Sequence, residues 1–177
     1  MFRRCFAAAL LAFALAAPAF ATDLQTFRDV QRQVLRYPHF TIFDTVSADV
    51  DEGIVTLTGK VTMPYKKSDI EKRVRRLSGV REVHNRIDVL PASQLDDNLR
   101  YNIARAIYRH PMFEPYAMMA NPPIHVVVER GRVTLEGVVN SEVERALARS
   151  IASSFLAFEV KNELRTEAEA RAELERL

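Results

Sequence analysis

The four histidines of this 177-residue chain have the widest chemical range of its side chains, because histidine serves as metal ligand, general base and nucleophile. They are His39, His84, His110 and His125. Their spacing fits neither a zinc site nor a nucleophile triad, and none is paired in sequence with a convincing carboxylate. The sequence therefore predicts no metal, no cofactor and no catalytic residue, and we expect a protein that is not an enzyme.

A basic segment offers a second kind of chemistry, which is the binding of anions. Between Lys60 and Arg86 the chain has nine basic and three acidic residues. Four of the cations lie away from the apolar face of a predicted helix: Lys72, Arg73, Arg75 and Arg76. Such a band attracts anionic lipid head groups by about 1 kcal/mol per residue near the surface. The alternative is an ordinary solvated helix face.

A short loop with adaptable apolar side chains is the third feature. Tyr116, Met118 and Met119 stand between Pro115 and a proline pair that ends at Pro123. If exposed, this loop is predicted to insert into a membrane or to contact a partner. The alternative is that it folds back over the core or the cleft between domains.

The first 21 residues have the pattern of a cleavable secretory signal. A basic start precedes an apolar run too short to span a bilayer comfortably, and Ala19 and Ala21 supply the small residues of a cleavage site. A retained anchor is the alternative, against which Pro18 argues. We expect cleavage after Ala21 and an extracytoplasmic mature protein. The lone cysteine, Cys5, would leave with the signal.

Net charge excludes one class of partner. Without Arg3 and Arg4 the 25 basic residues fall to 23, which equals the number of acidic residues. Because a neutral protein has no overall attraction for a polyanion, we expect no binding to nucleic acid.

An internal repeat is the main organising feature of the chain. The motif Gly-x-Val-Thr-Leu-x-Gly occupies residues 53–59 and returns at residues 131–137. Farther along, a Glu-Val-x-Asn segment that ends at Asn85 returns at Asn162. Because the matches keep one order at nearly one spacing, the sequence indicates two copies of one structural unit.

Each copy is predicted to form helix, strand, strand, helix, strand. The opening helices carry capping-box signatures at Thr22 and Ser93, and prolines follow their ends. Alternating apolar residues predict two strands joined by a three-residue hairpin, over 51–53 and 129–131. The second helix of the first copy starts either near Pro64 or at Ser68, with the repeat favouring the earlier start, and it ends at Gly79.

Apolar spacing also predicts which helix faces are buried. In the opening helices they are Phe27, Val30, Val34 and Tyr37, and in the second copy Leu95, Leu99, Ile103 and Ile107. In the following helices they are Ile70, Val74 and Leu77, and in the second copy Val143, Leu147 and Ile151.

These elements define an α+β protein of two tandem two-layer α/β sandwiches. Each has a three-stranded mixed sheet with both helices on one face. The expected division is a signal peptide over 1–21, a first domain over 22–91, a second over 92–166 and a charged helical tail over 167–177.

Six repeated residues are expected to be structural: Gly53, Gly59, Asn85, Gly131, Gly137 and Asn162. The first glycine of each copy lies in the hairpin, and the second lies in a strand that a helix is expected to approach closely. The asparagines are in phase with buried valines, so each amide is expected to tie a neighbouring loop to the sheet.

The paired Gly-x-Val-Thr-Leu-x-Gly motifs, with their flanking helices and Val-x-Asn segments, resemble the BON domain (bacterial OsmY and nodulation). The resemblance covers nearly all of residues 22–166. The second copy departs from the family pattern at Leu156-Ala157, where Gly-Val is usual, and carries an insert from Glu114 to Pro123.

This resemblance implies a periplasmic, OsmY-like tandem BON protein without a catalytic motif. It implies association with anionic phospholipid or envelope surfaces and a role in envelope integrity or stress tolerance. A protein-binding adaptor in an envelope assembly is the alternative.

Overall fold

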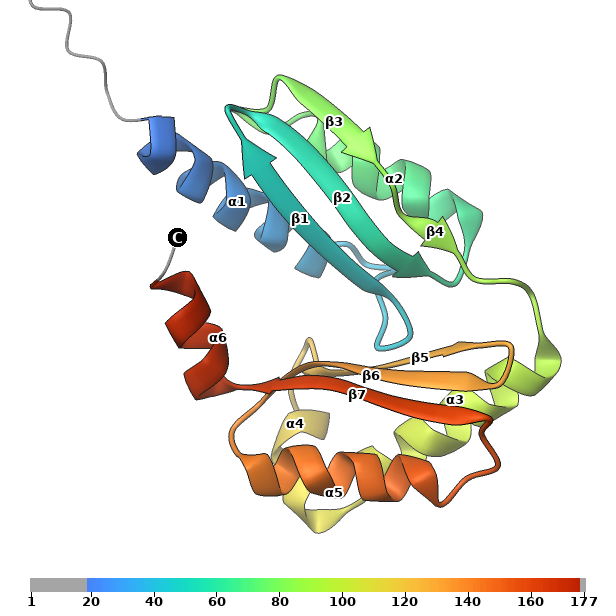
Figure 1. Cartoon of the computed structure of the whole chain (residues 1–177). Helices are drawn as coiled ribbons and strands as arrows, with labels where there is room; N and C mark the ends of the chain where they lie inside the picture. Colours follow the sequence, from blue (N-terminus) through green and yellow to red (C-terminus); the bar gives the residue numbers. More distant parts are fainter. Residues whose placement is uncertain (1–18, 176–177) are drawn as a thin grey trace, which may run out of the picture.

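The computed structural model describes residues 19–175, so most of the expected signal peptide lies outside the described residues. The first unit contains α1 (Ala19–Leu35), β1 (Thr45–Asp51), β2 (Ile54–Val61), α2 (Pro64–Val74), β3 (Glu82–Asn85) and β4 (Asp88–Val89). The second contains α3 (Gln94–Tyr108), a 3-10 turn (Pro111–Phe113), α4 (Glu114–Ala117), β5 (Ile124–Glu129), β6 (Arg132–Val139), α5 (Glu142–Ser153) and β7 (Glu159–Thr166). The expected helical tail is α6 (Glu167–Leu174) (Figure 1).

Both units have the same mixed sheet, which confirms the predicted α+β fold. In the first, β1 and β2 are antiparallel, and β3 and β4 both run parallel to β2. In the second, the order is β5-β6-β7, with an antiparallel hairpin and a parallel third strand. The last strand of the first unit is interrupted between Asn85 and Asp88, where the Ile87 N–H donates to the Asn85 side chain at 3.2 Å.

The hairpins are tighter than predicted. Asp51 pairs directly with Ile54, so the loop has two residues rather than three. Both loop residues have positive φ, 47° at Glu52 and 79° at Gly53, as a right-twisted two-residue hairpin requires. The second unit repeats this geometry at residues 130 and 131.

One aspartate in each unit fastens its hairpin to the opening helix. The Asp23 carboxylate of α1 accepts hydrogen bonds from the Glu52 and Gly53 N–H groups, at 3.0 and 3.1 Å. In the second unit, the Asp96 carboxylate accepts from the Arg130 and Gly131 N–H groups, both at 2.8 Å. Only one half of the capping box predicted at Ser93 forms. The Ser93 side chain caps α3, whereas the Asp96 carboxylate binds the hairpin.

Two predicted helix limits are wrong and one is confirmed. The first helix begins at Ala19, so Thr22 lies inside it and is not its cap. The second helix begins at Pro64, the favoured start, and ends at Val74. Gly79, with φ of 87°, follows a turn that separates it from that end.

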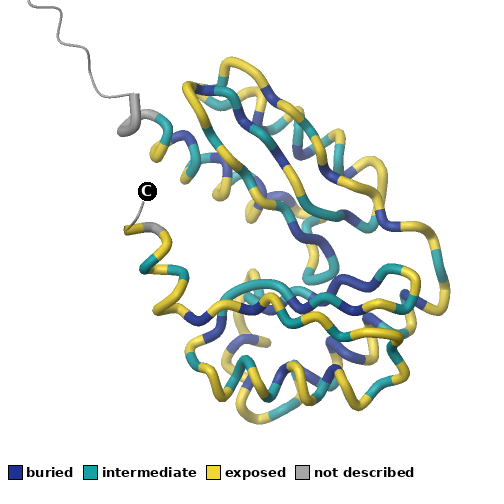
Figure 2. The backbone as a smooth tube through the Cα atoms, viewed as in Figure 1, coloured by how far each residue is buried: buried dark blue, intermediate teal, exposed yellow. Residues whose placement is uncertain are grey.

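Each unit has its own core between sheet and helices, and the buried positions are coloured in Figure 2. Two residues predicted to pack in the second core are exposed instead, Leu95 by 81% and Val143 by 63%. They lie in the first turns of α3 and α5. Ala148 and Ala152 are the fully buried residues of α5.

The strand glycines are needed because of a neighbouring strand, not a helix. A Cβ on Gly59 would overlap the Thr45 carbonyl of β1, and a Cβ on Gly137 would overlap the Pro123 carbonyl just before β5. Their φ values of 121° and 123° also lie in the region that glycine favours.

A loop between α1 and β1 joins the two units. The Ile42 carbonyl accepts a hydrogen bond from the Val126 N–H of β5, at 2.8 Å. Beside it, the His125 ring nitrogen Nδ1 lies 2.7 Å from the Asp44 carbonyl oxygen, and the Phe43 ring packs against Tyr101 at 4.7 Å. The first unit therefore covers part of the second sheet on the face opposite its helices (Figure 1).

Candidate functional site

The basic band of the first unit is more neutralised than its sequence indicated. Lys72 lies 3.9 Å from Asp69, and Arg75 pairs with Glu71 at 2.5 Å. Arg73 stacks over the Tyr37 ring, 5.0 Å from its centre. Arg75 and Arg76 follow the end of α2 at Val74, so only Lys72 and Arg73 are on the helix. Arg76 is exposed and makes no ion pair with a described residue.

The apolar loop of the second unit divides into a buried and an exposed part. Tyr116 is only 5% exposed, and its hydroxyl donates to the Glu144 carboxylate at 2.6 Å and accepts from the Asn140 N–H at 3.0 Å. Tyr116 is therefore a structural residue, and the prediction that it contacts lipid is wrong. Met118 and Met119, 84% and 48% exposed, remain available for binding.

A third apolar surface was not predicted from sequence. Leu156 is fully exposed, and Phe158 and Leu95 are 87% and 81% exposed. Leu156 and Phe158 lie in the loop between α5 and β7, and Leu95 lies at the start of α3. We call these three residues the apolar end of the second unit.

Hydrogen bonds hold the elements of the apolar end together. The Phe158 N–H donates to the Gly131 carbonyl at 2.9 Å, and its ring lies against Gly131. Gly131 is in turn bound by Asp96, the neighbour of Leu95. Figure 1 shows the start of α3, the β5–β6 turn and the α5–β7 loop at one end of the second unit.

Charges around the apolar end leave one cation unpaired. Glu129 binds Lys60 of the first unit at 2.5 Å, and Glu159 lies 3.5 Å from Arg132. The exposed Arg130 side chain makes no ion pair with a described residue. The apolar end is therefore flanked by a free guanidinium, the group that binds phosphate with two parallel hydrogen bonds.

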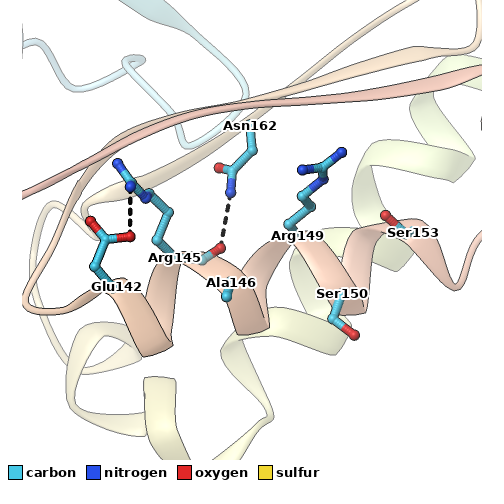
Figure 3. A pocket seen from close by; sticks show the side chains of 7 residues that line it. All are labelled: Glu142, Arg145, Ala146, Arg149, Ser150, Ser153 and Asn162. Atoms are coloured by element: carbon cyan, nitrogen blue, oxygen red, sulfur yellow. Dashed lines mark hydrogen bonds and ion pairs between the residues drawn. The ribbon is translucent and has the colours of Figure 1, made fainter.

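A groove of about 370 Å³ runs beside β7 (Figure 3). Its walls are Glu142, Arg145, Ala146, Arg149, Ser150, Ser153 and Asn162. The Asn162 amide donates to the Arg145 carbonyl at 2.9 Å, and Asn85 donates likewise to the Lys67 carbonyl at 3.0 Å. Each asparagine thus ties a helix, rather than a loop, to the last strand.

The histidines are separated in space as well as in sequence. Burial lowers the pKa of His125, even though the Asp44 carbonyl acts in the opposite direction, so the ring is held neutral at the joint between the units. His84 lies on the surface 3.0 Å from Glu82. Among residues 19–175, no group of three or more histidine, cysteine or acidic side chains could hold a metal ion.

No helix of the described region is long and apolar enough to cross a bilayer. What the geometry presents is a duplicated α+β protein with cations and apolar side chains gathered on its surface. The family model of the BON domain matches it twice, over residues 22–91 and 96–168, and the chain belongs to the BON-domain family. BON domains are binding domains associated with membranes and phospholipids, and they occur typically in periplasmic or envelope proteins.

Two solved structures are similar to the chain at low identity. One is the C-terminal domain of CdsD, the structural protein of the type III secretion system of Chlamydia trachomatis, at 17% identity with a TM-score of 0.33, covering 84% of this chain and 68% of that one. A second structure of CdsD has 15% identity and a TM-score of 0.30, covering 85% and 97%. No curated protein matches the chain.

Proposed function

We propose that the mature chain, residues 22–177, is a non-enzymatic periplasmic protein that binds anionic phospholipid surfaces and supports envelope integrity. Cleavage after Ala21 would release it from its signal peptide. The observation that carries the proposal is the apolar end, where Leu95, Leu156 and Phe158 are exposed. Beside them is the exposed Arg130, which makes no ion pair with a described residue.

Physical chemistry favours a lipid surface for this arrangement. Exposed side chains of this size gain free energy on leaving water, about 1.5–3 kcal/mol for each one that is fully buried. The Arg130 guanidinium, which is paired with no carboxylate among residues 19–175, can bind a lipid phosphate at the same time. Both interactions come from one end of the second unit, so they can act on one surface together.

Two other patches are weaker candidates for the same role. Lys72, Arg73 and Arg75 are already engaged by carboxylates or an aromatic ring of their own unit, which leaves Arg76 as the free cation of that band. Met118 and Met119 are exposed, but they follow α4, which lies away from the β5–β6 turn that carries Arg130 (Figure 1).

Vesicle flotation of residues 22–177 tests the proposal. We expect binding to phosphatidylcholine vesicles that contain phosphatidylglycerol, weaker binding without it, and weakening by salt. Leu156→Asp should reduce affinity about tenfold or more, because it puts a charge where an apolar side chain enters the interface.

Matched variants assign the surface. Met118→Asp makes the same change at a similarly exposed site, and Arg76→Glu tests the basic band. Binding that survives Leu156→Asp but is lost in Met118→Asp would assign the loop instead. No association with anionic vesicles at low salt would refute the lipid proposal, and crosslinking of the same chain to one envelope protein would then favour the adaptor.

A further inference from the structure

The two edges of the second sheet differ. The outer edge of β5 is covered, because the Val126 N–H donates to the Ile42 carbonyl of the first unit at 2.8 Å. At the other edge, β7 pairs with β6 at all eight of its residues, and its far side pairs with no described strand. Two of its N–H groups, those of Leu164 and Thr166, are bound by the Asn162 and Glu169 side chains and would have to be released for another strand to pair there. A long unpaired edge is a template for another strand.

Charges along β7 alternate in sign on the face of the sheet opposite α5. Four exposed residues make this row: Glu159, Lys161, Glu163 and Arg165. Charged side chains on an edge strand, lysine above all, commonly hinder pairing with another strand. In this row the charges alternate minus, plus, minus, plus along the strand. Two copies of the strand that run in opposite directions can therefore place opposite charges face to face.

Reversal about Asn162 brings opposite charges together. If two β7 strands pair antiparallel with Asn162 at the centre, Glu159 of each copy faces Arg165 of the other. Lys161 of each copy likewise faces Glu163 of the other. Four oppositely charged cross-strand pairs result, and such pairs stabilise a sheet.

Neighbouring registers are disfavoured by the same charges. Centring the pairing on Lys161 places Lys161 opposite itself and Glu159 opposite Glu163. Centring it on Glu163 places two glutamates in contact and Lys161 opposite Arg165. A two-fold axis normal to the sheet keeps the same face of both strands on the same side. The axis must therefore pass beside a residue, and the nearest alternative registers are those centred on the residue before or after Asn162.

We propose that β7 is a self-association edge, where a second copy of this chain adds its own β7 antiparallel about Asn162 to make a six-stranded sheet. On the helix side, Arg145 and Arg149 line the groove beside β7 together with small side chains such as Ala146, and a second copy would meet them there (Figure 3). In the single chain Lys161 already pairs with Glu163 along the strand. Arg165 likewise pairs with Glu173 of α6, and Glu159 with Arg132, so dimer formation exchanges three contacts within each chain for contacts between copies.

The first unit offers no comparable edge. Its β1 carries Thr45, Ser47, Asp49 and Asp51 on the corresponding alternation, without a basic residue. Its third strand is short and broken at Asn85. The association is therefore expected to stop at two copies, as an isologous contact does.

Charge reversal tests the proposal without disturbing either core. Sedimentation velocity of residues 22–177 over a wide range of concentration should show monomer and dimer. Lys161→Glu alone, and Glu163→Lys alone, should each weaken the dimer about tenfold or more, because each places like charges in contact twice. Lys72→Glu makes the same charge change far from the edge and should leave the dimer unchanged.

Mixing the two variants separates register-specific pairing from a general charge effect. Lys161→Glu and Glu163→Lys chains are complementary to each other about Asn162, so their mixture should form a dimer that neither forms alone. The double variant should also recover dimerisation. A wild-type chain that stays monomeric, a dimer indifferent to both single variants, or a mixture that gains nothing would each overturn the proposal.

Discussion

Asp44 is the residue whose replacement should most weaken the first unit. Its side chain is fully buried and accepts five hydrogen bonds, from the N–H and hydroxyl of Thr41, the N–H and hydroxyl of Thr62, and the Lys66 ammonium at 2.6 Å. Lys66 is itself buried, with 5% of its side chain exposed. We expect Asp44→Asn to lower the free energy of unfolding by about 3–5 kcal/mol, because it leaves a buried ammonium without its counter-charge.

The reciprocal change should cost less. In Lys66→Met the Asp44 carboxylate keeps four hydrogen bonds from the two threonines, at 2.7–2.9 Å, so we expect a loss of about 2–3 kcal/mol. Each single variant removes one member of the same ion pair. The double variant should therefore lower the free energy of unfolding by about 2 kcal/mol less than the sum of the two single losses.

Urea denaturation followed by far-UV circular dichroism measures these losses. The control is Glu144→Gln in the second unit, at the position that the repeat aligns with Lys66, where we expect about 1 kcal/mol. Single variants that each cost less than about 1 kcal/mol, or losses that add within about 0.5 kcal/mol, would refute the reasoning.

The pH dependence of stability in the same variants tests whether the folded protein stabilises the charged form of Asp44. Burial raises the pKa of Asp44, but the hydrogen bonds from Lys66, Thr62 and Thr41 outweigh it, and the pKa lies below the ordinary 3.8. A lowered folded-state pKa stabilises the protein above the unfolded value, and this is lost as pH falls through the folded value. The difference between wild type and Asp44→Asn should therefore be constant near neutrality and shrink below about pH 4.

Three further changes test other parts of the structure. Gly137→Ala should cost about 2–4 kcal/mol by urea denaturation, because its Cβ overlaps the Pro123 carbonyl at a φ of 123°, and a cost below that of an exposed substitution would contradict this contact. Burial and the Glu144 carboxylate raise the pKa of Tyr116 to about 12, so ultraviolet titration should lose one late-ionising tyrosine in Tyr116→Phe. His125→Asn keeps a donor for the Asp44 carbonyl but removes the titrating ring. Since burial lowers the His125 pKa, wild type should lose stability relative to this variant as pH falls below about 6.5. Stability curves of the two proteins that stay parallel over this pH range would contradict the lowered pKa.

Local pattern predicted the fold because each element carries its own periodicity. The hairpins, the early start of α2 at Pro64 and the Ser93 cap follow from residues within a few positions of each other. Errors arose where a distant partner decides the outcome. Asp96 fits a capping box locally, but the hairpin 34 residues away takes its carboxylate.

The candidate site was harder to predict, because exposure depends on the third dimension. Tyr116 and Met118 are both apolar residues of one loop, but only Tyr116 meets a carboxylate from α5 and becomes buried. Leu156 fits no helical or strand period, and it stands where the family pattern usually has glycine. The sequence signal for the apolar end was a large apolar residue, Leu156, that belongs to no helical or strand pattern.

The two units solve one structural problem with opposite charges. In the first, the start of the second helix is fixed by Lys66, which binds Asp44 from the loop before β1. In the second, the aligned Glu144 accepts from the Asn140 N–H and from Tyr116, which the insert supplies. The buried Asp44 carboxylate needs the Lys66 cation, whereas the Tyr116 hydroxyl of the insert donates to the half-buried Glu144, so the two helix residues can differ in charge.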